Sequence, residues 1–372
     1  MWSLDDKAGG FQCLLVTTYT KPLVRLSYPT IVFEFHRLPR DSLYLYSILY
    51  QSMMATQLPS KLLIIGATGN IGKHIANAVI FAEPRIASQI LVLTSLATAS
   101  SPEKQTLLSS WKSQGVSVIT GDISSADDVR NAYSGVDTVI SCLGRNAIAS
   151  QIELLKLAEA SKDVKWFFPS EYGTDIEYNA SSKDEEPHQN KLRVREFIRD
   201  DVKRIKCTYI VTGPYPEMYL TLSPAAPEAG GFDLKSKKAI IVESGEGKIG
   251  FTSMPDVGKL VAAALRSPEV SMGKVLKVQS FVTTPNAIVE ELEKQTGTNW
   301  SVQHRSMESL RKVEKESWNS NNPLATLYTL RRIWAEGGTL YDKTDNELLG
   351  LTPEDMESLS TIVERAVNGK GH

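Results

Sequence analysis

The chain is poor in cysteine and has no long apolar run. Only three of its 372 residues are cysteine, Cys13, Cys142 and Cys207, too few and too scattered for a disulfide framework or a cysteine zinc site. No stretch approaches the roughly 18 consecutive apolar residues of a membrane-spanning helix. The opening residues lack the basic segment and continuous apolar core of a secretory signal. We therefore expect a cytoplasmic protein in a reducing compartment, without a membrane partner.

The chain also lacks an excess of charge of either sign. Lysine and arginine total 41 against 43 aspartates and glutamates, a formal net charge of -2. Because no global positive field exists to hold a polyanion, nucleic acid is not expected as a partner. His36, His188 and His304 have no companions at metal-ligand spacing, and His74 is expected to be a surface or packing residue, so no metal site is expected.

A glycine-rich turn follows the first strongly apolar segment. Residues 62–75 read LLIIGATGNIGKHI, with glycines in a GxxGxxG spacing. A strand that ends near Ile65 and gives way to a helix would aim free backbone amides at a bound diphosphate. A turn without a ligand is the alternative, because a glycine triplet alone is a weak signal. The predicted cofactor contacts of the turn are Gly66, Thr68, Gly69, Asn70, Ile71 and Gly72.

Apolar strands alternate with amphipathic helices in the residues that follow. This alternation predicts right-handed parallel crossovers, and hence an α/β fold with a Rossmann-type doubly wound parallel sheet. A helix after residue 101 is expected to have Ser101 as its N-cap. The expected strands are 62–65, 89–94, 116–120, 136–141, 164–168, 207–211 and 239–242, with 275–278 closing the sheet. The later expected helices are 256–265 and 285–294, with mixed helix and loop from Gln303 onward.

The predicted organisation has three parts. Residues 1–58 are expected to form an extension outside the fold, because they are aromatic and poorly periodic. Residues 59–280 are expected to form the NAD(P)-binding domain, with 213–236 contributing to the substrate region. Residues 281–372 are expected to form a smaller, C-terminal substrate-binding subdomain.

The residues after the second strand favour NADP(H) over NAD(H). NAD-selective sheets place an acid there, which binds the ribose hydroxyls and repels a 2′-phosphate. Here no acid occurs between Glu83 and Glu103; instead the strand leads to Thr94 and Ser95, and Lys104 follows in the next helix. Hydroxyl donors and an ammonium suit a phosphate. The alternative is that Lys104 is simply solvated on an exposed face.

Several motifs in order resemble the isoflavone-reductase-like (NmrA-like) branch of atypical short-chain dehydrogenases. The resemblance runs from about residue 61 to 367. Its most specific segment is FFPSEYGTD, residues 167–175. The other motifs are GATGNIG at 66–72, SPEK ending at Lys104, VISCLG ending at Gly144 with Gln151 after it, and Lys191 followed by Arg193 and Arg195.

The resemblance implies NADPH as cofactor, with Gly144 and Gln151 among its contacts, and a catalytic lysine at Lys191. A lysine beside a nicotinamide and a partly buried substrate can have its ammonium form disfavoured, which suits proton transfer. The alternative is a solvated helix residue. Arg193 and Arg195 are expected to point elsewhere on the helix.

Two departures from the family pattern concern specificity. The arginine that grips the 2′-phosphate in the family is replaced in register by Thr94. The loop between Asp175 and Lys191 is polar and acidic, unlike a pocket already shaped for one aromatic substrate. The resemblance therefore leaves the substrate open.

Other candidates near the predicted site have open roles. Tyr172 is either a catalytic phenol or a packing residue under the cofactor, and Ser170 is a possible hydrogen-bond donor. Tyr178 and Lys183 are five residues apart, so they do not form the YxxxK pair of other short-chain dehydrogenases. An aromatic set either lines a substrate pocket or belongs to the core; it comprises Trp300, Trp318, Trp334, Tyr215 and Tyr219.

Two classes of function fit these observations. The first is an NADPH-dependent reductase of small aromatic, isoflavone- or phenylpropanoid-like molecules, with Lys191 as proton donor or acceptor. The alternative is a non-enzymatic NAD(P) sensor that reports redox state to a protein partner, as some NmrA-like relatives do. Such regulators lack the lysine, which favours the enzyme. The sequence predicts no oligomeric state.

Overall fold

The computed structural model describes residues 58–369. All but the last residue of the expected extension, 1–58, lies outside the described residues. Within 58–369 no helix combines the length and apolarity needed to cross a membrane. Cys142 and Cys207, the two cysteines in this part of the chain, are buried free thiols.

Six parallel strands form the central sheet, and their order confirms the predicted doubly wound fold. Leu62 of the central strand β1 pairs with Ile90 on one side and Thr138 on the other, so β1 is enclosed by β2 and β4. The order across the sheet is β3 (Ser117–Thr120), β2 (Gln89–Thr94), β1 (Lys61–Ile65), β4 (Thr138–Ser141), β5 (Trp166–Phe168) and β6 (Lys206–Cys207).

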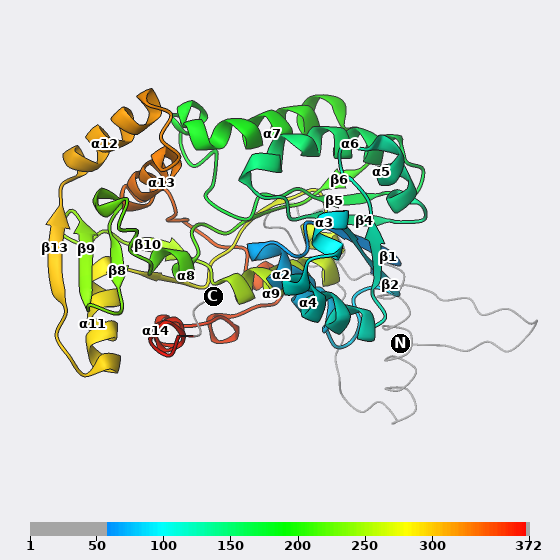
Figure 1. Ribbon diagram of the computed structural model, residues 1–372. Coiled ribbons are helices and arrows are strands. Elements are labelled where there is room, and N and C mark those ends of the chain that lie inside the picture. The colour runs from blue at the N-terminus through cyan, green and yellow to red at the C-terminus, as the bar shows by residue number, and fades with distance from the viewer. Residues whose placement is uncertain (1–57, 370–372) are drawn as a thin grey trace, which may run out of the picture. The chain divides into compact units, whose positions relative to one another are not determined.

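Helices cover both faces of this sheet because β1 is apolar on both sides. Leu62 and Ile64 belong to one buried cluster, whereas Leu63 and Ile65 belong to another. This is the alternation expected of a pleated strand buried on two faces. Figure 1 shows the helices on opposite sides of the strands. One face carries α2 (Asn70–Ile80), α4 (Pro102–Ser113) and α9 (Met254–Arg266), and the other α5 (Ala126–Tyr133), α6 (Gln151–Ala160) and α7 (Gln189–Asp201).

The expected strand at 207–211 is divided at Thr208. Residue Pro169 follows β5 and has no amide hydrogen, so β5 cannot continue the ladder beside residues 209–211. Strand β7 (Tyr209–Val211) pairs instead with β11 (Val275–Lys277). The expectation that 275–278 closes the main sheet is therefore wrong, because β11 pairs with β7 in a separate two-stranded ladder.

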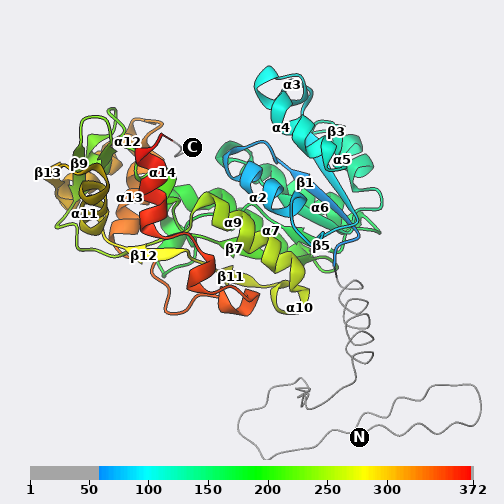
Figure 2. The ribbon, with the colours of Figure 1, turned by 90° about the horizontal axis from the view of Figure 1, so that it is seen from below.

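A second, smaller sheet lies apart from the central sheet, on the left of Figure 2. Its order is β13 (Ser301–Arg305), β9 (Lys238–Val242) and β8 (Gly231–Asp233). The expectation of mixed helix and loop from Gln303 is wrong for β13. Its sequence SVQHR has one strongly apolar residue, and four of its five residues are exposed, so it is an edge strand without the usual alternation.

The second sheet is built from both sides of residue 280. β8 and β9 precede that residue and β13 follows it. We therefore propose that the subdomain comprises several elements that precede residue 280, β8 and β9 among them, together with residues 281–369. Its other elements are α8 (Pro216–Tyr219), β10 (Ile249–Phe251), β12 (Phe281–Thr283), α11 (Pro285–Thr296), α12 (Met307–Asn319), α13 (Ala325–Ala335) and α14 (Leu359–Val367). Of the two short helices outside it, α3 (Leu96–Ala99) follows β2 and α10 (Pro268–Ser271) lies between α9 and β11.

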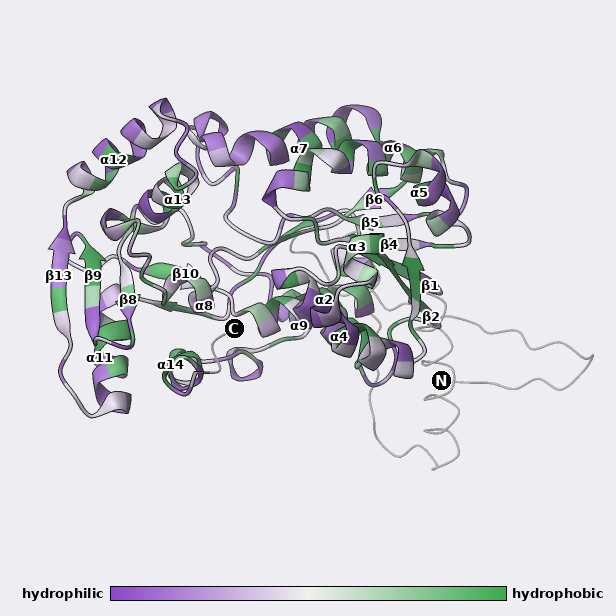
Figure 3. Cartoon of the chain, in the orientation of Figure 1, coloured by the Kyte–Doolittle hydropathy of each residue, from purple (hydrophilic) through white to green (hydrophobic). Residues whose placement is uncertain are grey.

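Hydropathy separates the buried strands from the outer helices. Figure 3 shows β1 and β4 in green, whereas α7 and α12 carry much purple. In α7 only Val194 and Arg195 are buried. Lys191 lies in the first turn of this polar helix and contacts Glu171, which follows β5.

Candidate functional site

The glycine turn is shaped by two close backbone approaches. Gly66 has a φ of +76°, and a Cβ there would lie 2.7 Å from the carbonyl oxygen of Cys142. A Cβ on Gly72 would lie 2.2 Å from the carbonyl oxygen of Gly66. The amide of Gly69 donates to that same oxygen at 3.1 Å, which closes the turn. Gly66 and Gly72 are thus required for the turn to pack, whatever it binds.

The first turn of α2 presents unpaired amides. Its N-cap is Gly69, which has no side chain to cap the helix, and the first turn contains no acidic residue. The first helical hydrogen bond runs from the amide of Lys73 to Gly69 O at 3.0 Å. The amides of Asn70, Ile71 and Gly72 therefore remain as donors at the positive end of the helix dipole. This donor set fits a diphosphate.

Lys104, one of the residues predicted to hold the 2′-phosphate, contacts the glycine turn. Its Nζ donates to the carbonyl oxygen of Thr68 at 3.3 Å. Thr94 is buried at the end of β2. Ser95 is the N-cap of α3 and accepts the amide of Thr98 at 3.2 Å, so its hydroxyl is already engaged. Ser101 occupies the N-cap position of α4, as expected, although its side chain makes no capping hydrogen bond.

Gln151 and Ser170 join the ends of β4 and β5. The buried amide oxygen of Gln151 accepts the backbone amide of Ser170 at 2.7 Å, and Ser170 Oγ donates to Leu143 O at 2.8 Å. Next to Leu143, Gly144 faces open space, because nothing lies within 4 Å of where its Cβ would be. Gln151 and Ser170 thus hold the ends of the two strands in place, and Gly144 leaves open space beside them.

Lys191 reaches from α7 to the end of β5. Its Nζ donates to the carbonyl oxygen of Glu171 at 2.6 Å and lies 3.8 Å from Glu171 Oε2. The side chain of Lys191 is 19% exposed, so it remains partly accessible. Burial lowers the pKa of Lys191; the nearby Arg195 and Arg145 act in the same direction, and Glu171 opposes them. The ammonium is held in place and yet made a readier proton donor.

Arg195 belongs to the surroundings of Lys191, contrary to the sequence expectation. Its guanidinium binds both oxygens of Glu171, at 3.1 and 3.2 Å, and also pairs with Glu177. Arg193 is exposed and bonds to Asn190, as expected of a residue pointing elsewhere. The four-residue spacing of Lys191 and Arg195 on one helix was the available signal, because i and i+4 share a face.

A cavity of about 270 Å³ opens in front of Lys191. Its wall includes Ile71 of the glycine turn and Gly144, so it begins where the diphosphate amides end. Tyr172 also borders it, but the phenol oxygen is buried without a partner, and burial raises its pKa well above the usual value. Packing is therefore the role that the structure favours for Tyr172.

The predicted aromatic set divides into two groups. Trp334 and Tyr215 border the cavity, where Trp334 Nε1 donates to Thr174 Oγ1 at 2.8 Å. Tyr219 packs against Phe251 and other rings in the core of the subdomain. Trp300 and Trp318 do not border this cavity, and their indoles bond to Thr296 and Thr329.

His188 is a neighbour of the site that sequence reasoning set aside. Its Nδ1 lies 3.0 Å from Ser182 O, and because a carbonyl only accepts, this nitrogen carries the hydrogen. Burial lowers the pKa of His188, which keeps the ring neutral. In the described part of the chain no group of three or more His, Cys, Asp or Glu side chains is placed to hold a metal ion.

The sequence model of the NmrA-like family matches residues 59–349. The chain belongs to the NmrA-like family. Among curated members, isoflavone reductase of Pisum sativum is 28% identical over 298 residues, which cover 78% of this chain and 91% of the pea protein.

Solved structures of the family share the fold. A crystal structure of isoflavone reductase superposes with a TM-score of 0.69 at 25% identity, covering 83% of this chain and 99% of that one. AtPrR2, solved with NADP+ and (+)pinoresinol, gives a TM-score of 0.68 at 22% identity, covering 84% of this chain and 98% of that one.

Proposed function

We propose that this NmrA-like protein is an NADPH-dependent reductase of small aromatic, isoflavone- or phenylpropanoid-like molecules, with Lys191 as proton donor or acceptor. The enzyme class is oxidoreductase and the cofactor is NADP(H). Curated relatives are isoflavone reductases, and AtPrR2 was solved with NADP+ and pinoresinol. The observation that carries the proposal is the ammonium of Lys191 at a cavity that begins beside the uncapped first turn of α2.

The cofactor contacts follow from the donors described above. The amides of Asn70, Ile71 and Gly72 would bind the diphosphate, in a turn shaped by Gly66, Thr68 and Gly69. The 2′-phosphate would be held by Lys104, with Thr94 and Ser95 nearby. Gly144 would border the nicotinamide, and Gln151 would support it through Ser170. Bound NADPH supplies the hydride.

Lys191 supplies the proton that balances the hydride. When hydride reaches an unsaturated or benzylic carbon, the electron pair moves to an oxygen of the substrate, which takes a proton from Nζ. The Glu171 carbonyl fixes one N–H of Lys191, leaving the others free for the cavity. Desolvation weakens the hold of nitrogen on the proton, so transfer needs no further acid.

NADPH oxidation across a panel of aromatic enones and benzylic ethers tests this proposal. We expect the wild type to turn over a subset, and Lys191→Ala to lose about 10²- to 10⁴-fold in kcat. The exposed Lys183 offers a matched control, since Lys183→Ala removes a nearby lysine without touching the cavity. Equal rates for wild type and Lys191→Ala on every compound would contradict the role of Lys191.

A non-enzymatic sensor is the competing function. It predicts a stoichiometric complex with a protein partner that depends on NADP+ and survives Lys191→Ala. The cytoplasmic location stays a prediction, which cell fractionation would test.

A further inference from the structure

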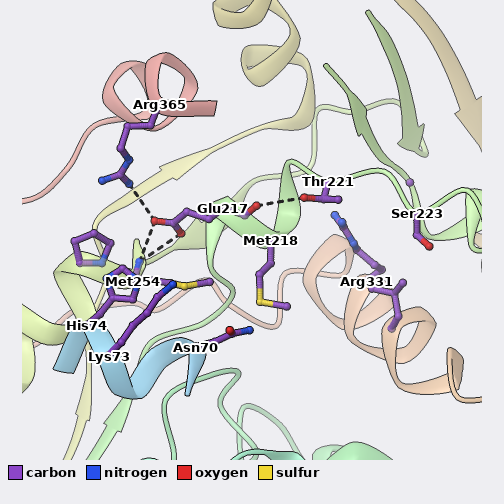
Figure 4. Close-up of a pocket in the computed structure, with 13 residues that line it drawn as sticks. Asn70, Lys73, His74, Glu217, Met218, Thr221, Ser223, Met254, Arg331 and Arg365 are labelled. Atoms are coloured by element: carbon purple, nitrogen blue, oxygen red, sulfur yellow. Dashed lines mark hydrogen bonds and ion pairs between the residues drawn. The ribbon is translucent and has the colours of Figure 1, made fainter. Parts of the chain in front are cut away.

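Figure 4 shows a second cavity, of about 440 Å³, which Lys191 does not border. Side chains from the cofactor helix α2 form one wall and side chains from α8 and α13 form others. Met218 of α8 borders both cavities and is 54% exposed. A flexible, accessible thioether thus forms the shared wall, and the two spaces adjoin there.

Helix α13 contributes to both cavities with one face. Leu330 and Trp334 border the Lys191 cavity, whereas Leu327 and Arg331 border the second one. These are neighbouring positions at i, i+3 and i+4 on the helix surface. A ligand whose ring lies beside Trp334 would therefore need only a short substituent past Met218 to reach Arg331.

The second cavity has an excess of positive charge. Lys73, Arg331 and Arg365 border it, against one carboxylate, Glu217. That carboxylate is already occupied, because it accepts the amide of Met254 and the guanidinium of Arg365, each at 3.1 Å. Two cations, Lys73 and Arg331, are left without a carboxylate among the residues that line the cavity.

Arg331 is buried and unneutralised. It is 5% exposed, and its Nη2 donates to the backbone oxygen of Tyr219 at 3.0 Å while the guanidinium lies 3.9 Å over that ring. Nε has no hydrogen-bond partner, and no ion pair with Arg331 occurs among residues 58–369. Burial lowers its pKa.

The next residue in the sequence, Arg332, differs from Arg331 because its charge is neutralised. Arg332 pairs with three carboxylates, those of Glu185, Glu314 and Glu336. A buried guanidinium without an anion is costly in free energy, whereas an arriving anion would gain a charge-assisted hydrogen bond at a desolvated site. The uncompensated charge of Arg331 thus marks a place for an anionic group.

We propose that the second cavity binds a carboxylate of the substrate through Arg331 and Lys73, so that the enzyme is selective for aromatic acids. The inference rests on the proposed function, because it assigns the substrate class of the same site. A carboxylate suits the site better than a phosphate, because Met218, Met254 and Leu327 make much of the wall apolar. Within residues 58–369, Nη2 of Arg331 is engaged by Tyr219 and Nε is buried, which leaves Nη1 to donate a charge-assisted hydrogen bond to the carboxylate.

Calorimetry on the NADP+-loaded protein tests the proposal with two pairs of probes. These are 4-hydroxybenzoate and 4-hydroxycinnamate, each against its methyl ester, which keeps the ring and removes the charge. For at least one pair we expect the wild type to bind the acid about tenfold more tightly than the ester. Arg331→Met should abolish that preference and Arg331→Lys should retain part of it. Lys73→Met, at a partly exposed position, should reduce it several-fold.

Each outcome decides the question. Equal or tighter binding of the ester in both pairs by the wild type overturns the proposal, as does a preference for the acid that survives both Arg331→Met and Lys73→Met. If Arg331→Met does not fold, Lys73→Met and Arg331→Lys decide. Competition by inorganic phosphate as strong as that by the acids would overturn the choice of a carboxylate. Failure of the reductase proposal is distinguishable, because it would appear as absent binding of NADP+ or absent NADPH oxidation.

Discussion

The ammonium of Lys191 is held by the main chain of Glu171 rather than by its carboxylate. Nζ lies 2.6 Å from the carbonyl oxygen and 3.8 Å from Oε2, while Arg195 takes both carboxylate oxygens. The position of Lys191 therefore depends on the backbone at the end of β5, and the charge of Glu171 acts on it at a distance. The position of Lys191 and its pKa can therefore be altered by separate substitutions.

Replacing Glu171 by glutamine should move the pH profile of reduction. An ammonium proton donor is active below its pKa, so kcat should fall as pH rises through that value. Glu171 raises the pKa of Lys191 against the effect of burial, so Glu171→Gln should lower it and shift the alkaline limb of kcat to lower pH. The control is Glu177→Gln, which removes a carboxylate that pairs with Arg195 but not with Lys191. An identical shift in both variants would contradict the assignment.

Substitutions at Gly72 in the glycine turn and at Gly144 after β4 should have different effects. Gly72→Ala places a Cβ 2.2 Å from Gly66 O, so we expect a loss of about 1–3 kcal/mol in the free energy of unfolding. Gly144→Ala has open space around its Cβ, so it should fold normally and weaken NADPH binding instead. Thermal denaturation and calorimetry with NADPH separate the two effects. Normal stability of Gly72→Ala would argue against the described turn.

Lys104 should decide between the two nucleotides. We expect Lys104→Ala to weaken NADPH by about tenfold and to leave NADH unchanged, because a charge-assisted bond to the 2′-phosphate is lost. Lys112→Ala, an exposed lysine on the same helix, is the matched control. If the substitution raises the measured dissociation constants equally for both nucleotides, Lys104 lies away from the 2′-phosphate.

His74 should make the protein less stable in mild acid. Burial, with Lys73 and Arg365 nearby, lowers its pKa from 6.5 to about 4 in the folded chain. The unfolded chain therefore binds the proton more readily, and the stabilising contribution present above about pH 6.5 is lost as pH falls toward 4. Urea unfolding between these values should show a shallower decline for His74→Gln than for wild type. His304→Gln, at an exposed histidine, should decline as wild type does.

The central sheet was predictable because its strands are buried on both faces. Residues such as Leu62 to Ile65 give a continuous apolar run, and the glycine turn fixes where β1 ends. Strand β13 was not predictable in this way. Four of its five side chains are exposed, and its pairing with β9 joins segments about sixty residues apart, which no local pattern encodes.

The parts of the site that lie within one continuous segment were predictable from the sequence. The contacts between separate segments were not. Lys191 and the glycine turn are found from motifs. The bond from Arg195 to Glu171 depends on how α7 packs beside the segment that follows β5. The unpaired state of Arg331 depends on which acids the rest of the described chain brings near. Charge compensation is a property of three-dimensional neighbours, so spacing in the sequence does not report it.

Helix α13 has a consequence for how such an enzyme diversifies. It borders the reaction space through Leu330 and Trp334 and the cationic space through Leu327 and Arg331, yet it contributes nothing to the glycine turn. Substitutions along this one helix would change which compounds the enzyme accepts and leave the binding of NADPH unchanged. Exchanging α13 for the corresponding helix of a related protein is accordingly a direct route to a new selectivity.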